Sequence, residues 1–92
     1  MTNTNINTKA DTTYNGWKNR QTWNISLWIN NDEPLYRAAV EFMKTYKGKK
    51  PYVAFIKANY MQEDRTPDNI KYISTRICYE ELNDMMKEFI EE

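Results

Sequence analysis

A single cysteine, Cys78, is the sequence feature that most restricts how this chain can fold. Without a second cysteine no internal disulfide can form, so a chain of 92 residues must be stabilised by its core alone. The sequence supplies side chains for such a core, with three Trp, seven Tyr and three Phe. Each large ring buries about 150–250 Å². We therefore expect one small domain with a core rich in aromatic side chains.

The polar start of the chain sets the expected limits of that domain. Residues 1–13 are rich in Thr and Asn and nearly without apolar side chains, a composition typical of disordered tails. The sequence predicts a disordered tail over residues 1–13 and a single domain over residues 14–92. Asn15-Gly16, at the start of this domain, is a strong turn dipeptide.

Helical periodicity is clearest in the middle and at the end of the chain. Asp32 is a predicted N-cap, and Gly48 a predicted left-handed terminator, of a helix between them. Pro51 is expected to open a shorter helix with Val53, Ile56 and Tyr60 on its inner face. A last helix is expected from Tyr79. Apolar side chains recur at helical spacing in the first and last helices: Leu35, Ala38, Ala39, Phe42, Met43 and Tyr46, then Tyr79, Leu82, Met85, Met86, Phe89 and Ile90.

The segment Thr22–Ile29 has two interpretations. Trp23, Ile25, Leu27 and Ile29 alternate with Asn24, Ser26 and Trp28, which is the periodicity of a strand. Ile70–Thr75 alternates in the same way. These patterns predict an α+β fold, in which a small antiparallel sheet packs with about three helices in one compact domain. The alternative is a helix capped by Asn19, which makes the chain all-helical.

The chemistry of most enzymes is missing from the sequence. There is no histidine, so Ser-His and Cys-His dyads are excluded, and Cys78 has no partner for a zinc site. The two glycines, Gly16 and Gly48, are too far apart for a phosphate-binding loop. Glu81 and Asp84 are a carboxylate pair on one helix face, which a hydrolase would need, but this pattern is more typical of a solvated face. We predict a protein that is not an enzyme and that uses no metal and no cofactor.

Charge is segregated although the formal net charge is zero. Cationic and aromatic side chains interleave before residue 24 and again around residue 50, which favours contact with a nucleic-acid backbone. The last helix is acidic and is expected to contact basic groups of a protein. The alternative is that the two charged regions neutralise each other within the fold. The predicted RNA contacts are Lys18, Arg20, Lys47, Lys49, Lys50, Tyr52 and Lys57, and the predicted protein contacts are Trp17, Glu80, Glu81, Asp84 and Glu88.

A longer motif carries a resemblance to a known family. The stretch Asn15–Asn24, which contains NRQTW, continues through LWINNDE to Leu35-Tyr36-Arg37, and TPDNIKY precedes the acidic final helix. This pattern is similar to the leading motif of a family of small phage proteins. Over its full length the chain resembles the phage anti-CRISPR proteins of the type I-F class, specifically the eighth family of that class.

The resemblance implies a function and a partner. Proteins of this kind inhibit the type I-F CRISPR surveillance complex, a Cascade-type ribonucleoprotein, by touching its protein subunits and guide RNA and preventing target DNA from hybridising. It implies stoichiometric action in the host bacterial cytoplasm, with no membrane, no small-molecule substrate and no strong binding to isolated DNA. The sequence also shows neither a signal peptide nor an apolar stretch of about 20 residues. The alternative function is a free-standing phage module that binds RNA or single-stranded DNA.

Overall fold

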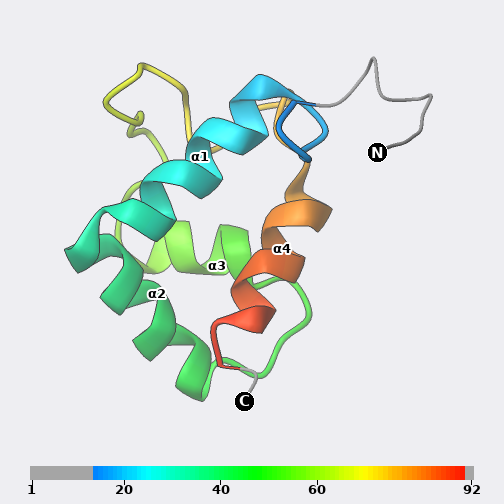
Figure 1. Cartoon of the computed structure of the whole chain (residues 1–92). Helices are drawn as coiled ribbons and strands as arrows, with labels where there is room; N and C mark the ends of the chain where they lie inside the picture. Colours follow the sequence, from blue (N-terminus) through cyan, green and yellow to red (C-terminus); the bar gives the residue numbers. More distant parts are fainter. Residues whose placement is uncertain (1–13, 91–92) are drawn as a thin grey trace.

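Asn19 starts the first helix by accepting a hydrogen bond from the backbone N–H of Thr22 at 2.8 Å. In the computed structural model, which describes residues 14–90, this helix is α1 and spans Arg20–Asn31 (Figure 1). The strand predicted for Thr22–Ile29 is therefore wrong, and the alternative of a helix capped by Asn19 holds. The buried positions of α1 include four at intervals of three and four residues, which form one helical face: Thr22, Ile25, Ser26 and Ile29.

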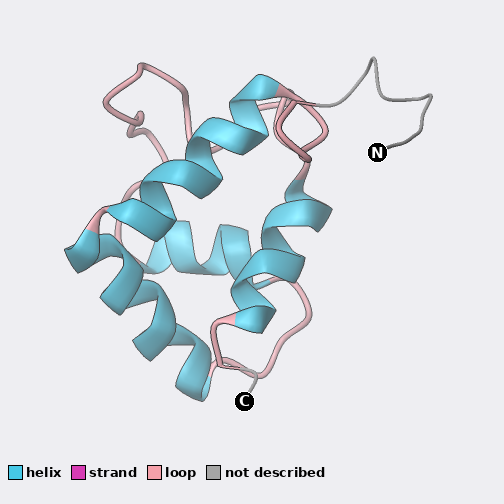
Figure 2. Ribbon diagram, in the orientation of Figure 1, coloured by secondary structure: helices cyan, strands magenta, loops and turns pink. Residues whose placement is uncertain are grey.

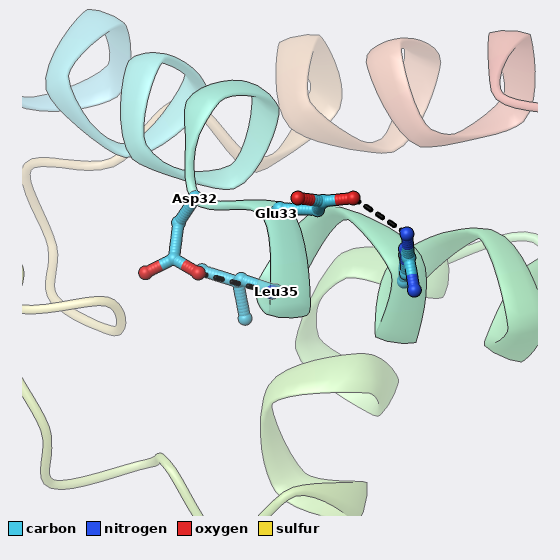
Figure 3. A network of polar contacts seen from close by, with 4 residues as sticks. Asp32, Glu33 and Leu35 are labelled. Carbon is cyan, nitrogen blue, oxygen red and sulfur yellow. Dashed lines mark hydrogen bonds and ion pairs between the residues drawn. The ribbon is translucent and has the colours of Figure 1, made fainter.

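Asp32 ends α1 and starts α2. Its backbone N–H donates to the carbonyl of Trp28 at 3.0 Å, while its carboxylate accepts from the backbone N–H of Leu35 at 3.2 Å. Figure 3 shows this cap, with Glu33 beside it, at the first turn of α2, which spans Glu33–Thr45. No linker therefore separates the two helices, and the amphipathic helix predicted here is confirmed.

The role predicted for Gly48 is wrong. The helix ends in an extended residue, Tyr46, and Gly48 does not adopt a left-handed φ. The ring of Tyr46 instead folds back over Gly48, so that a Cβ atom at this position would overlap the phenol. The hydroxyl of Tyr46 donates to the carbonyl of Lys50 at 3.3 Å. A side chain at position 48 would therefore have to displace the Tyr46 ring, and the backbone conformation there does not require glycine.

Two further helices complete the fold. α3 spans Pro51–Ala58 and α4 spans Tyr79–Glu88. The side chain of Asn83 in α4 accepts a hydrogen bond from the backbone N–H of Tyr52 at 2.9 Å, so α4 caps the start of α3. Tyr60, predicted on the inner face of α3, lies beyond the end of the helix and is 86% exposed. The buried faces of these helices are formed by Pro51, Tyr52, Phe55 and Ile56, and by Leu82, Met85 and Met86.

The fold is all-helical over residues 14–90, which corrects the predicted α+β class (Figure 2). Within this range the only β-type pairings are two isolated bridges, Tyr14 with Trp17 and Arg65 with Lys71. The strand predicted for Ile70–Thr75 is therefore absent. In Thr22–Ile29 the alternation arises because polar side chains enter the interior. Asn24, for example, is buried and hydrogen-bonded to Thr66 and Asp68, so its polarity does not mark a solvent-facing position.

The helices share one core. α1 packs against α2 and α4, and α3 packs against α4 and α2 (Figure 1). The core contains apolar side chains from all four helices and from the loop between α3 and α4, including Ile29, Ala39, Phe55, Tyr72 and Leu82. None of the helices in the described part of the chain is long and apolar enough to cross a membrane. The predicted tail, residues 1–13, lies outside the described residues.

Candidate binding groove

A groove of about 650 Å³ lies between the N-terminal turn, the junction of α1 and α2, and α4. Four of the five residues predicted to contact a protein meet in it: Trp17, Glu81, Asp84 and Glu88. The fifth, Glu80, lies outside it. The remaining lining residues, none of them predicted from the sequence as contacts, are Gly16, Asn30, Tyr36, Met85 and Phe89.

A tight turn positions Trp17 at one end of the groove. Tyr14 and Trp17 exchange two backbone hydrogen bonds, of 2.6 and 2.8 Å. Between them Asn15 and Gly16 have φ values of 50° and 89°, as a two-residue hairpin turn requires. The predicted turn is therefore confirmed. The next residue, Lys18, donates its backbone N–H to the Glu81 carboxylate at 2.8 Å, which joins the turn to α4.

Three carboxylates form the α4 wall of the groove. Glu81, Asp84 and Glu88 follow one another at intervals of three and four residues, so they share one helix face. Glu81 is half-buried, and Asp84 and Glu88 are exposed. The ion pairs of residues 14–90 are Arg37–Glu33 and Lys44–Glu41, so none of the three carboxylates has a cationic partner there. Their negative charge in the groove is therefore not neutralised by an ion pair within the described residues.

The rest of the groove lining is largely aromatic and apolar. The rings of Tyr36, from α2, and Phe89, after α4, meet edge to face with centroids 5.1 Å apart. Asn30 donates its amide to the carbonyl of Ser26 at 2.8 Å and contacts the sulfur of Met85 at 3.3 Å. These contacts join α1, α2 and α4 around the groove. Tyr36 is 36% exposed, so part of its side chain is accessible from solvent.

This combination of groups selects a cation with a flat or apolar body. Carboxylates attract a guanidinium or ammonium group, and ring faces stabilise the same cation by cation–π attraction. Arginine fits best, because its planar guanidinium both stacks on rings and bonds carboxylates in a bidentate manner. Within residues 14–90 no group of three or more acidic, Cys or His side chains is arranged to hold a metal ion.

Comparison with known proteins identifies the family but no activity. A family model described as a family of unknown function, DUF7249, matches residues 10–92. The chain belongs to the DUF7249 family. No curated protein and no solved structure matches it. The match extends over the groove and all four helices of this DUF7249 chain.

The predicted RNA contacts of the DUF7249 chain do not form one surface. Lys49 and Lys50 line a second hollow, of about 660 Å³, which also contains Glu80, Asp84 and Lys87. Their charge is therefore partly offset by α4, as the alternative of mutual neutralisation requires, although no ion pair of 4.0 Å or less joins them among the described residues. Lys47 is exposed in the same loop, and Lys57 is exposed near the end of α3.

Tyr52 is excluded as a contact, because it is fully buried. Its hydroxyl donates to the backbone carbonyl of Tyr72 at 2.7 Å, and burial raises the pKa of this phenol. Its position beside the Lys-rich loop made it look exposed in the sequence. However, it lies three and four residues before Phe55 and Ile56, and that spacing places it on the inner face of α3. Lys18 and Arg20 are exposed around the start of α1.

Sequence reasoning missed the aromatic wall of this DUF7249 groove. Tyr36 and Phe89 are 53 positions apart, and only the packing of α2 against α4 brings them together. The sequence places Phe89 in the apolar stripe of the last helix, and it does pack against the core, but it is only half-buried and also lines the groove. The available signal was its place at the end of that stripe, one residue after Glu88, where an apolar ring borders the acidic face.

Proposed function

We propose that this protein is a non-catalytic binding protein that seats an arginine-bearing segment of a partner protein in the groove between Trp17 and α4. The observation that carries the proposal is the set of three carboxylates that line one groove with aromatic side chains and have no cationic partner among residues 14–90. Such a groove is stabilised when a partner supplies the missing cation. The aromatic rings add contact area at low entropic cost.

The resemblance described above supplies the identity of the partner. We propose that it is the type I-F CRISPR surveillance complex in the host cytoplasm, and that the protein blocks target DNA by occupying subunits that would otherwise grip it. Proteins that bind DNA do so with Lys and Arg side chains. The acidic face of α4 is complementary to those side chains. The neutral net charge argues against indiscriminate binding to isolated DNA.

Capture of the assembled surveillance complex by immobilised protein tests the proposal. The double variant Asp84→Arg, Glu88→Arg reverses two groove charges and is expected to weaken capture by at least about tenfold, because like charges then face the partner's arginine. Both residues are exposed, so the fold should survive. Circular dichroism of the variant checks this.

A matched control separates groove contact from net charge. Glu63→Arg with Asp64→Arg makes the same change in charge at two exposed positions of the loop between α3 and α4. This control is expected to retain capture. Equal binding by the groove variant, or equal loss in both variants, would show that the groove does not hold the partner. Failure of the unmodified protein to capture the complex would refute the partner itself.

A further inference from the structure

A small basic pocket of about 260 Å³ lies between the first turn of α1 and the loop that precedes α4. Its lining contains Lys71 and Arg76, neither of which the sequence singled out as a contact. The other lining residues are Gln21, Asn69, Ile70 and Ser74, and none of the lining residues is acidic. Ammonium, guanidinium, amide and hydroxyl groups can all donate hydrogen bonds. The lining is therefore suited to an anion.

The loop that carries these groups is held in place by hydrogen bonds. The hydroxyl of Tyr79 accepts from the backbone N–H of Ser74 at 2.9 Å and donates to the carbonyl of the same residue at 2.8 Å. The amide of Asn19 donates to the carbonyl of Arg76 at 2.7 Å. Lys71 forms an isolated bridge with Arg65. Because the backbone is held from both sides, an arriving anion meets a preformed site.

The charges around the pocket are mainly positive. Among the described residues neither Lys71 nor Arg76 forms an ion pair, and exposed Arg20 and Lys18 extend the positive surface around the start of α1. The nearest acidic residue in sequence is Asp68, which lies close enough to Arg20 to interact with it. One oxygen of the Asp68 carboxylate accepts from both Asn24 and Trp28, at 2.8 Å each. It is thus engaged by α1 and does not line the pocket.

We propose that this pocket binds a phosphodiester group of a single-stranded nucleic acid, with Lys71 and Arg76 as its charged ligands and Gln21 and Ser74 as neutral donors. Arg20 and Lys18 would bind neighbouring phosphates along the same strand. The inference deepens the proposed function by giving the protein a nucleic-acid contact separate from its protein groove. It places that contact away from the Lys47–Lys50 loop, whose hollow includes two carboxylates.

Binding of a short single-stranded RNA to the isolated protein tests the site, with DNA of the same sequence as a second arm. Lys71→Glu with Arg76→Glu is expected to weaken RNA binding about tenfold and to lower the salt slope by about 0.7, because the pocket contacts one phosphodiester group and each phosphate contact on a single strand contributes roughly 0.7. The control Lys47→Glu with Lys57→Glu makes the same change in charge and should leave the slope within about 0.3 of the unmodified protein. The DNA arm shows whether the 2′-hydroxyl contributes.

The outcome is independent of the surveillance complex. Equal losses in the two double variants, or a larger loss in the control, would overturn the pocket as the phosphate site. Absence of any RNA or DNA binding by the unmodified protein would overturn it as well. Amide shifts of Gln21, Ser74 and Arg76 on titration with inorganic phosphate give a second readout that needs no variant. No shift at these amides alongside RNA binding elsewhere would also refute the proposal.

Discussion

Tyr60 is a residue whose backbone conformation conflicts with its side chain. It has a φ of 58°, which is uncommon for a bulky residue, and its ring is 86% exposed. The neighbouring hydrogen bonds, from Tyr60 N–H to the carbonyl of Lys57 and from Met61 N–H to that of Ile56, form the helix-ending motif in which glycine is usual. The left-handed conformation costs a non-glycine residue about 1–2 kcal/mol. Little packing of the ring offsets this cost.

Replacing this tyrosine should therefore stabilise the protein. Tyr60→Gly is expected to raise the free energy of unfolding by about 0.5–1 kcal/mol, the relieved strain less the greater entropy of glycine in the unfolded chain. Urea denaturation measures the change. Tyr60→Ala removes the same ring but keeps the strained φ, so it should give no such gain. A gain of equal size in both variants would show that the ring, and not the backbone, is unfavourable.

At the scale of elements, helix ends are completed by side chains from other parts of the chain. α3 has no capping side chain of its own, and Asn83 of α4 supplies the acceptor for its first turn. Conversely, the first residue before α4, Cys78, donates its backbone N–H to the hydroxyl of Thr22 in α1 at 2.9 Å. Each of these bonds satisfies a backbone group that a helix leaves without an internal partner. The helices therefore depend on one another for their ends as well as for their core.

Asn83→Ala tests this dependence. Loss of the acceptor should lower the free energy of unfolding by about 1 kcal/mol, the usual effect of removing a helix cap. Thermal unfolding followed by circular dichroism at 222 nm is a suitable measurement. Asn83→Asp keeps an acceptor oxygen and should preserve most of the stability. If alanine and aspartate variants unfold alike, the bond to Tyr52 contributes nothing.

At the scale of the whole molecule, the long connection between α3 and α4 is tied to α1 through Asp68. The hydrogen bonds from Asn24 and Trp28 hold the pKa of the Asp68 carboxyl below its usual value of 3.8. The ionised form is thus favoured by folding. Its contribution to stability is fully present above the unfolded-state pKa and is lost as pH falls through the lower folded-state pKa.

Asp68→Asn should make the protein less sensitive to acid. The free energy of unfolding of the unmodified protein is expected to fall as pH drops below about 4, and that of the variant to fall less over the same interval. Urea titrations at several pH values between neutral and acidic conditions measure both curves. Parallel curves would mean that Asp68 has the same pKa in the folded and unfolded protein.

The sequence predicted the parts of the fold that depend on local patterns. The Asp32 cap, the stripe from Leu35 to Met43 and the Asn15-Gly16 turn are all local, and all are confirmed. The strand predicted for Thr22–Ile29 is wrong because the apolar alternation of this segment is also compatible with a helix. The inner face of that helix includes buried polar side chains. Those polar groups are satisfied by Thr66, Asp68 and the backbone N–H of Cys78, from 42 to 56 positions away. A local sequence pattern cannot indicate hydrogen-bond partners that lie so far away along the chain.

The candidate sites, too, were predictable only where they depend on local spacing in the sequence. The acidic face of α4 follows from helical spacing, and the sequence predicted it. The aromatic wall and the basic pocket are built from segments that meet only in the folded chain, so their residues carried no signal individually. Tyr52 shows the opposite error, since a neighbouring run of lysines suggested exposure for a ring that is fully buried.

The groove is closed by contacts between distant parts of the chain, and this affects when it forms. Three hydrogen bonds join the region from Lys18 to Thr22 with the region from Arg76 to Glu81, across separations of 56 to 63 residues. Contacts of such high sequence separation form late in folding, because the entropy of loop closure must be lost first. α1 and α2 can pair early during synthesis. A nascent chain therefore completes this groove only after α4 has emerged from the ribosome.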